Sequence, residues 1–329
     1  MKNTFIILII VSLLAACSTD NTPLLILDTD IGPDYDDAGA MACMYALEAE
    51  GKCRVLGVIS SNLSPHTLPN IEIINRYYNR SDLPVGRVTG EGVNEKGWHK
   101  KSWSEYIATK YAPTTLTPAN VPDAVWLYRK LLSQSPDHSV TICTIGFLTN
   151  LSKLLVSVGD EHSSLRGYQL VTLKVKRLVV MGGGFPDGNE YNLHKHPDAS
   201  IHVASSWPTP IYFCGFEVGD KVLTGKKTAA GGADDNPVAD IYRVALAQDN
   251  PEGRQSWDQL TVLAAIEGPE AYFDLVRGNI LMLPDGRNRW EDKPTGNHYY
   301  MAPNVSNAQL AERVEELMSR PVGKLTESP

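Results

Sequence analysis

The stretch Leu24–Ala40, LLILDTDIGPDYDDAGA, runs from an apolar segment directly into a dense group of aspartates. The continuous apolar residues predict a buried strand, and the residues from Asp36 onward predict a helix. Ionised carboxylates packed this closely repel one another, and burial strengthens the repulsion by removing water, so a compensating partner is required. A hard cation is the simplest candidate. The aspartates concerned are Asp28, Asp30, Asp34, Asp36 and Asp37.

Short apolar runs alternate with helical patterns along the rest of the chain. Buried strands are predicted at 23–28, 53–60, 139–146, 175–184 and 209–215. Helices are predicted at Asp36–Ala49, Leu68–Tyr78, Asp123–Leu132 and Leu148–Ser157. This alternation predicts an α/β fold with an open, mostly parallel, Rossmann-like central sheet and helices on both faces. In such folds ligands bind beyond the carboxyl ends of the strands, where the aspartates lie. The stretches 90–117 and 225–237 lack a regular pattern and are interpreted as loops.

The composition is that of a folded globular protein. With 329 residues and 43% hydrophobic content, the chain can bury a full core, and we expect residues 22–329 to form a single domain. The net charge of -8 argues against a nucleic acid polymer as partner, because phosphate binding draws on clustered Lys and Arg side chains.

The first residues, MKNTFIILIIVSLLAACSTD, are typical of a secretory signal, with a lysine, an apolar run and then small residues. LAAC resembles a bacterial lipobox, so residues 1–17 are interpreted as a lipoprotein signal peptide whose Cys17 becomes lipidated. An ordinary signal peptide with an incidental cysteine is the alternative. We therefore expect a protein of the bacterial cell envelope, facing the periplasm or the surface, that is attached to the membrane by its lipid anchor only.

The remaining cysteines lie in apolar patterns without C-x-x-C spacing, and they are Cys43, Cys53, Cys143 and Cys214. Buried thiols fit this pattern better than zinc ligands or a thiol nucleophile. An exported compartment would also permit a bridge between Cys43 and Cys53.

Three interpretations compete for the aspartates. An EF-hand loop needs Gly at its sixth position and Glu at its twelfth, but counting from Asp28 these positions hold Pro33 and Gly39, so that interpretation fails. LLILDTDIG also resembles the D-x-D motif of haloacid-dehalogenase-type magnesium phosphatases, with Asp28 as nucleophile and Asp30 as general acid. That match ends after three residues.

The third interpretation is the nucleoside hydrolase family of inosine- and uridine-preferring N-ribohydrolases, which the stretch resembles through D-x-D-x-G followed by paired aspartates. TICTIGFLTNL resembles the family's T-x-G-x-L-T-N segment, and VVMGGGFPDGNEYNLHKHPDAS resembles its M-G-G-G segment followed by E-[FY]-N. SWDQLTVLAA resembles its late segment, where an Asp opens a helix. Each motif alone is also what a turn or polar loop would show, but four in order from Asp28 to Ala265 favour the family.

The resemblance implies a calcium site and a catalytic base. Its ligands would be Asp30, Asp37, the backbone carbonyl of Thr144 and Asp258, which are the oxygen donors that calcium prefers. The ion would bind the attacking water and lower its pKa, and Asp30 would take the proton as general base.

The resemblance also implies side chains that bind the ribose of a nucleoside. Asp36, Glu190 and Asn192 map onto the family's sugar-binding positions, and Asn62 is a further candidate, with an ordinary loop asparagine as the alternative. Asp28 matches a position that supports the site from behind. GPDYDD is two residues longer than the family's compact G-x-D-D form, so Asp34 has no counterpart and is interpreted as a helix cap.

Besides the longer GPDYDD stretch, the chain differs from the family pattern at the residue that would act on the leaving base. Many members carry a His before the late Asp, but this chain has Trp257. A Trp there resembles the purine-preferring branch, in which indoles stack on the base, and Trp98 or Trp103 could supply the second face. His99 is an alternative acid, and plain core packing is the alternative for Trp257.

Together these residues predict calcium-dependent hydrolysis of the N-glycosidic bond of nucleosides, with a weak indication of purine preference. Two alternatives stay open: a magnesium phosphatase, and a non-catalytic envelope protein that binds nucleosides or sugars. The family resemblance also implies a homodimer or a homotetramer.

Overall fold

The computed structural model describes residues 22–322. They contain a 10-stranded sheet in the order β3-β2-β1-β4-β5-β7-β12-β10-β11-β6, in which neighbours from β3 to β12 are parallel and the remaining pairs are antiparallel. A separate two-stranded sheet joins β8 and β9. The strands are β1 Leu24–Thr29, β2 Arg54–Ser60, β3 Val85–Arg87, β4 Val140–Thr144, β5 Val175–Met181, β6 Asp187–Gly188, β7 Ile211–Cys214, β8 Leu223–Thr224, β9 Arg254–Gln255, β10 Phe273–Met282, β11 Asn288–Asp292 and β12 His298–Pro303.

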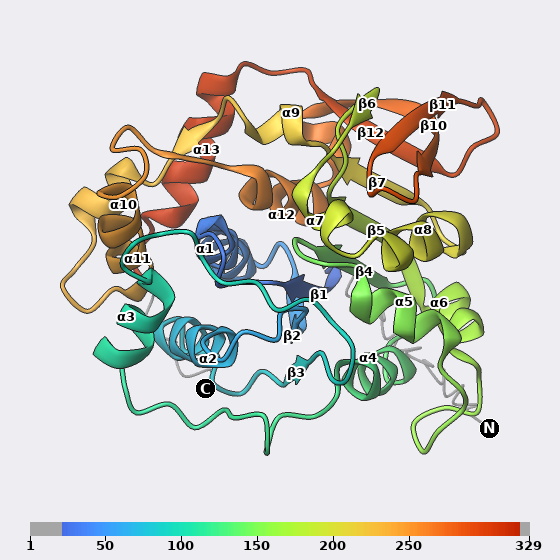
Figure 1. Ribbon diagram of the computed structural model, residues 1–329, viewed down its shortest axis with the longest axis horizontal. Helices are drawn as coiled ribbons and strands as arrows, with labels where there is room; N and C mark the ends of the chain where they lie inside the picture. Colours follow the sequence, from blue (N-terminus) through green and yellow to red (C-terminus); the bar gives the residue numbers. More distant parts are fainter. Residues whose placement is uncertain (1–21, 323–329) are drawn as a thin grey trace, which may run out of the picture.

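Helices cover both faces of the sheet (Figure 1), as the alternating pattern predicts. On one side lie α1 Asp36–Ala49, α2 Thr67–Tyr77, α11 Pro237–Leu246, α12 Trp257–Glu267 and α13 Asn307–Met318. On the other lie α4 Ala124–Ser133, α5 Thr149–Val156, α6 Gly167–Lys174 and α8 Pro197–Ser206. Shorter elements are α3 Trp103–Lys110, α7 Tyr191–Lys195, α9 Phe216–Gly219, α10 Lys226–Gly231 and the 3-10 turn Pro269–Ala271.

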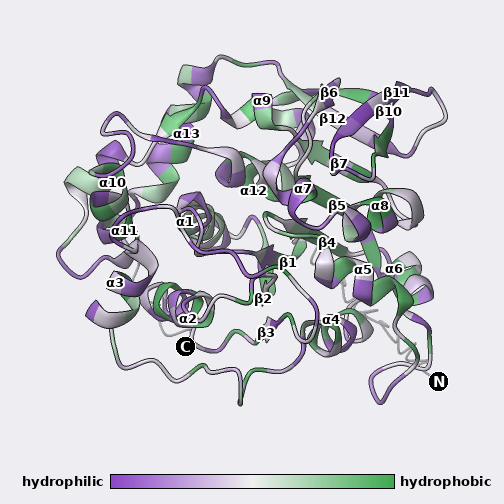
Figure 2. Cartoon of the chain, viewed as in Figure 1, coloured by the Kyte–Doolittle hydropathy of each residue, from purple (hydrophilic) through white to green (hydrophobic). Residues whose placement is uncertain are grey.

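The core is divided by the sheet into two layers. In β1, Leu25 and Leu27 pack into one layer, whereas Leu24 and Ile26 pack into the other, because successive side chains of a strand point to opposite faces. Figure 2 shows the hydrophobic residues gathered on the central strands and on the helix faces that cover them. A strand that is buried on both faces, such as β1, needs a continuous run of apolar residues, and that run is the signal from which the strand was predicted.

Two expectations about the fold were wrong. The stretch 90–117 is not all loop, because it contains α3, which Ser102 caps by accepting a hydrogen bond from the Glu105 backbone. The stretch 225–237 contains α10. The expectation of buried thiols is confirmed, because all four described cysteines are free and buried, and the alternative bridge between Cys43 and Cys53 is absent. Cys43 lies inside α1, where its thiol is packed near the Val314 carbonyl.

None of the helices within residues 22–322 is both long and apolar enough to cross a membrane. The predicted signal peptide and Cys17 lie outside the described residues.

Candidate active site

A cavity lies beyond the carboxyl ends of β1, β4 and β5, at the edge of the sheet where the fold predicts a ligand. Most of the side chains singled out in the sequence meet there, although they are far apart along the chain. Its lining residues are Asp30, Asp34, Asp36, Ile145, Met181, Glu190, Tyr191, Asn192, Phe216, Trp257 and Asp258.

Three carboxylates at this cavity have no cationic side chain beside them. Asp30 follows β1, Asp37 lies in the first turn of α1, and Asp258 lies in the first turn of α12, and all are at most 4% exposed. Burial raises the pKa of each carboxyl well above its usual value, and repulsion from neighbouring aspartates raises it further. Hydrogen bonds to Asp30 and Asp37 oppose the rise in part, but no cationic side chain among residues 22–322 pairs with any of the three carboxylates.

Two oxygen atoms near these carboxylates are buried without a hydrogen-bond partner among the described residues. One carboxylate oxygen of Asp37 accepts from the Thr29 hydroxyl, but the other is buried without a partner among the described residues, as is the hydroxyl of Thr144. Within residues 22–322, no group of three or more His, Cys, Asp or Glu side chains is already arranged to hold a metal ion. The donors are hard oxygens with uncompensated negative charge, so they fit a hard divalent cation in chemistry, and Asp30, Asp37 and Asp258 would have to converge on it.

Arg254 is a residue of the site that the sequence did not reveal. Its Nη2 lies 2.6 Å from an Asp34 oxygen and 2.9 Å from Asp36 Oδ1, and its Nε donates to the same Asp36 oxygen at 3.0 Å. Arg254 and Asp36 are 5% and 1% exposed. Burial raises the pKa of Asp36 to about 6, and the guanidinium opposes that rise. Part of the compensation that the aspartates require is therefore a buried arginine.

The same contacts correct the assignment of Asp34. The N-cap residue of α1 is Tyr35, and no side chain caps the helix. Asp34 instead binds Arg254, a partner contributed by β9.

Glu190 and Asn192 are held by the backbone around the end of β5. Glu190 caps α7, accepting from the backbone N–H groups of Asn192 at 2.7 Å, Leu193 at 3.1 Å and Gly183 at 3.2 Å. Burial raises the pKa of Glu190 to about 7, and these hydrogen bonds oppose the rise. Both side chains line the cavity next to Asp30 and Asp258.

Asp28 and Asn62 lie behind the cavity and do not line it. Asp28 is fully buried and accepts from the Tyr128 hydroxyl at 2.9 Å and from the Asn150 amide at 3.1 Å. The Asn62 amide donates to the Asp30 and Glu95 carbonyls at 3.1 and 3.0 Å, and its oxygen accepts two backbone N–H groups. The Asn62 side chain thus holds the loop after β1 in place, and the ribose role stays a prediction.

The aromatic residues are arranged differently from the expected sandwich. Trp257 lines the cavity beside Phe216, whose carbonyl accepts from the indole N–H at 2.7 Å. The centre of the Arg254 guanidinium lies 5.0 Å from the Trp257 ring and 5.5 Å from the Trp98 ring, so both indoles already contact a cation. Trp103 is 1% exposed in the core, because it begins α3 and points inward, and it cannot stack on a ligand.

His99 lies against Tyr35 and Trp98, with ring centroids 5.6 and 5.1 Å away, and does not line the cavity. Burial lowers the pKa of its imidazole, which disfavours the protonated form that a leaving-group acid needs.

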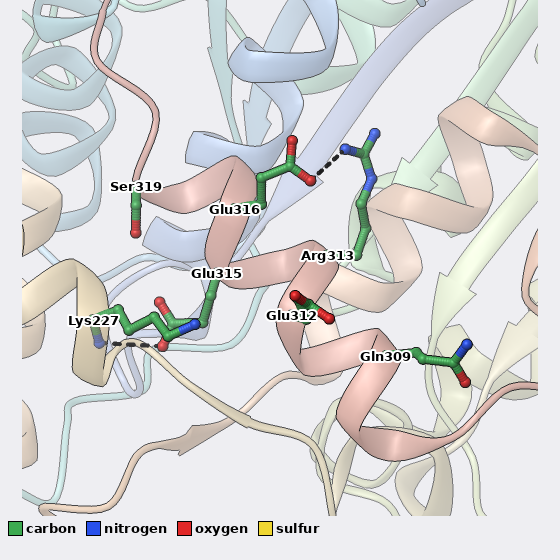
Figure 3. A pocket seen from close by; sticks show the side chains of 7 residues that line it. All are labelled: Lys227, Gln309, Glu312, Arg313, Glu315, Glu316 and Ser319. Atoms are coloured by element: carbon green, nitrogen blue, oxygen red, sulfur yellow. Dashed lines mark hydrogen bonds and ion pairs between the residues drawn. The ribbon is translucent and has the colours of Figure 1, made fainter.

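A second hollow, of about 530 Å³, lies along α13 (Figure 3). Two of its charged side chains already have partners: Arg313 binds Glu267 and Glu316 at 2.8 and 3.1 Å, and Glu315 accepts from the Gly225 backbone N–H at 2.7 Å. This hollow is a stabilised seam between α10 and α13 rather than a ligand site.

Known proteins resemble this chain in sequence and in fold. A pyrimidine-specific ribonucleoside hydrolase, RihA, of Shewanella sp. (strain MR-7) is 30% identical over 202 residues, which are 59% of either chain. A probable uridine nucleosidase 2 of rice (Oryza sativa subsp. japonica) is 29% identical over 212 residues, or 60% of this chain and 58% of the relative. The match thus spans about three fifths of the curated relatives' length.

Solved structures share the fold at lower identity. A plant nucleoside hydrolase, PpNRh1, superposes with a TM-score of 0.69 at 18% identity, covering 91% of this chain and 100% of the other. A purine-preferring ribonucleoside hydrolase from Gardnerella vaginalis gives 0.66 at 18% identity, covering 90% and 99%. The profile of the family described as inosine-uridine preferring nucleoside hydrolase matches residues 25–311, and the chain therefore belongs to that family.

Proposed function

We propose that this protein hydrolyses the N-glycosidic bond of nucleosides and releases the base and ribose. The observation that supports this most is the convergence of Asp30, Asp36, Glu190 and Asp258 on one cavity at the carboxyl edge of the sheet. Cleavage of that bond passes through an oxocarbenium-like state, whose positive charge carboxylates stabilise.

The side chains divide the work by position. Asp30, which makes no side-chain ion pair within residues 22–322, takes a proton from the attacking water as the C1′–O bond forms and the bond from C1′ to the base nitrogen breaks. Asp36, Glu190 and Asn192 hold the ribose hydroxyls. The departing base receives its proton from solvent, because the described residues place no His, Lys or Arg side chain in the cavity lining.

We propose Ca²⁺ as the cofactor, held by Asp30, Asp37, Asp258 and the Thr144 carbonyl. When bound, the ion supplies positive charge that lowers the pKa of a nearby water. The orphaned oxygen of Asp37 and the strongly raised pKa values of the three carboxyls support this choice.

For the base, Trp257 indicates purines, whereas the relatives from Shewanella and rice are named for pyrimidines and uridine. Because Arg254 already contacts both Trp257 and Trp98, a base sandwiched by the indoles would have to displace it. We therefore expect uridine to be hydrolysed at least as well as inosine, and the ratio of their kcat/KM values tests the purine prediction.

The two alternatives are weaker on specific grounds. A phosphatase would need Asp28 as nucleophile, but that carboxylate is fully buried behind the cavity and bound by Tyr128 and Asn150. A protein that only binds nucleosides would need Glu190 and Asn192 but not a free carboxylate at Asp30.

We further propose that the mature chain is attached to the bacterial envelope through a lipidated Cys17. Intact-mass spectrometry of the membrane-extracted protein should show the acyl chains on a fragment that begins at Cys17. An unlipidated soluble chain would disprove the anchor.

Asp30→Asn tests the mechanism. The substitution keeps the size of the side chain but removes the base, so we expect release of base from uridine and inosine to fall by at least about a thousand-fold with the fold intact. Asp187→Asn, on an exposed carboxylate, is the matched control. Undiminished hydrolysis by Asp30→Asn would refute the proposal, and turnover of sugar phosphates instead of nucleosides would favour the phosphatase.

A further inference from the structure

A third hollow, of about 570 Å³, lies at the opposite edge of the sheet from the active site. It forms where four neighbouring parallel strands begin: Leu24 of β1 is level with Arg54 of β2 and Val140 of β4, and Thr141 of β4 is level with Arg177 of β5. This register brings basic residues that are far apart in sequence to one place. The basic residues that line the hollow are Arg54, His138, Lys176 and Arg177.

These cations are not neutralised within the described part of the chain. Arg54 and Lys176 are exposed and take part in no ion pair or side-chain hydrogen bond between residues 22 and 322. Arg177 donates only to the Ala265 carbonyl, at 3.1 Å, and its Nε is buried without a partner among those residues. The acidic residue of the lining, Asp137, is already bound by Lys174 at 2.7 Å.

The contrast with the hollow along α13 is informative. There Arg313 and Glu315 have protein partners (Figure 3). The charges of that lining that are unpaired among the described residues, Lys227 and Glu312, have opposite signs, so no ligand charge is needed. Here three unpaired cations gather on a chain whose net charge is -8. Burial lowers the pKa of Arg177, and the opposing influence of Tyr212 and Glu270 does not reverse the shift, so an anion in the hollow would offset the cost of burying the guanidinium.

We propose that this hollow binds the phosphodiester headgroup of an anionic phospholipid in the membrane that carries the protein. A phosphodiester bears the negative charge that Arg54, Lys176 and Arg177 lack, and guanidinium groups hold phosphate oxygens through paired hydrogen bonds. The hollow is far larger than a phosphate, and Pro23 and Pro136 give it an apolar rim, so it has room for the glycerol groups on both sides of the phosphate.

The length of the tether supports a membrane as the source of that headgroup, and this step rests on the proposed lipidation of Cys17. Four residues lie between Cys17 and Thr22, which lines the hollow, and the five steps from one Cα to the next span at most about 3.5 Å each, or roughly 17 Å together. The lipidated cysteine would therefore keep this edge of the sheet close to the headgroups. The active site, about 20 Å away at the other ends of the strands, would face the aqueous side and receive soluble nucleosides.

The test uses full-length protein in detergent and three water-soluble probes: glycerophosphoglycerol, glycerophosphocholine and inorganic phosphate. Isothermal titration should show saturable binding of glycerophosphoglycerol and much weaker binding of zwitterionic glycerophosphocholine. Each basic residue near an anionic surface contributes roughly five-fold in affinity, so Arg54→Gln with Lys176→Gln should weaken binding about 30-fold. Lys221→Gln with Lys293→Gln removes the same charge from exposed positions elsewhere and should change nothing.

The proposal fails if glycerophosphoglycerol does not bind saturably, or if the two double variants bind it equally. It also fails if inorganic phosphate binds more tightly, because that ranking identifies a site for free phosphate. Both double variants should retain wild-type nucleoside hydrolysis and thermal unfolding. Since headgroup binding is measured without substrate, an inactive but headgroup-binding wild type would count against the proposed function alone.

Discussion

Arg254→Met should lower the free energy of unfolding, because it removes the cation that compensates the buried Asp36 carboxylate. Methionine fills most of the apolar volume of the arginine stem but leaves the Asp36 carboxylate, 1% exposed, without its cation. Removing one partner of a buried ion pair costs about 3 to 5 kcal/mol, because the remaining charge stays desolvated. Asp34 contributes less to this cost, since 24% of its side chain is exposed and water can solvate it.

A second substitution, Asp36→Asn, should change stability in opposite directions in the wild type and in the Arg254→Met variant. Asp36→Asn should destabilise the wild type, because it removes a partner of Arg254. In the Arg254→Met background the same substitution should restore about 2 kcal/mol or more, because it removes the uncompensated charge. The free energy of unfolding is measured by urea denaturation followed by circular dichroism, with a calcium chelator present so that ion binding does not contribute.

Arg289→Met is the matched control. Arg289 also binds an aspartate, Asp187, at 3.2 Å, but the two side chains are 61% and 66% exposed, and such pairs contribute at most about 1 kcal/mol. If Arg254→Met costs no more than Arg289→Met, or if Asp36→Asn destabilises both backgrounds equally, the buried ion pair does not have the compensating role assigned to it.

Three further predictions concern the site and the sheet. Gly146→Ala would place a Cβ 2.6 to 2.9 Å from Ser61 Oγ and from the Asp30 backbone N and Cβ, so it should cost about 1 to 3 kcal/mol and lower kcat, whereas Gly231→Ala, with open space around it, should do neither. Calcium at one hundred times the Kd of the site should stabilise the chelator-treated wild type by about 2.7 kcal/mol, which is measured as a rise in melting temperature. Asp258→Asn should reduce that rise. Burial lowers the pKa of His298 to about 4, below the unfolded value near 6.5, so between these pH values the unfolded chain takes up a proton that the folded chain does not. The free energy of unfolding that depends on neutral His298 is therefore fully present above pH 6.5 and is lost as pH falls toward 4. That contribution is about 3 kcal/mol, and urea titrations of the wild type and His298→Asn from pH 7 to 4 should diverge by this amount and in this direction.

Five parallel strands were predicted from their continuous apolar runs, namely β1, β2, β4, β5 and β7, whereas the three-residue β3 was too short to show such a run. The antiparallel strands β10, β11 and β12 were not predicted, since they mix buried and exposed positions without a clean alternation. A local signal for α3 did exist: Ser102 and Glu105 form the Ser-x-x-Glu pattern of a helix start.

The site residues divide in the same way. Asp30, Glu190, Asn192 and Asp258 follow strands or open helices, and the topology brings such positions to one edge of the sheet. Arg254 belongs to no local pattern, and its partner Asp36 lies 218 residues earlier in the chain. The only sequence signal for it was indirect, namely the surplus of aspartates that required a positive partner somewhere.

That surplus is divided between two kinds of compensation. Arg254 binds Asp34 and Asp36, and its Nη1 lies 3.8 Å from Asp249, so three carboxylates share one guanidinium. This group therefore keeps a net negative charge, which under the proposed function leaves Asp36 able to accept a hydrogen bond from a sugar hydroxyl. Asp30, Asp37 and Asp258 meet no guanidinium within residues 22–322, and they are the carboxylates that the proposed metal ion would compensate.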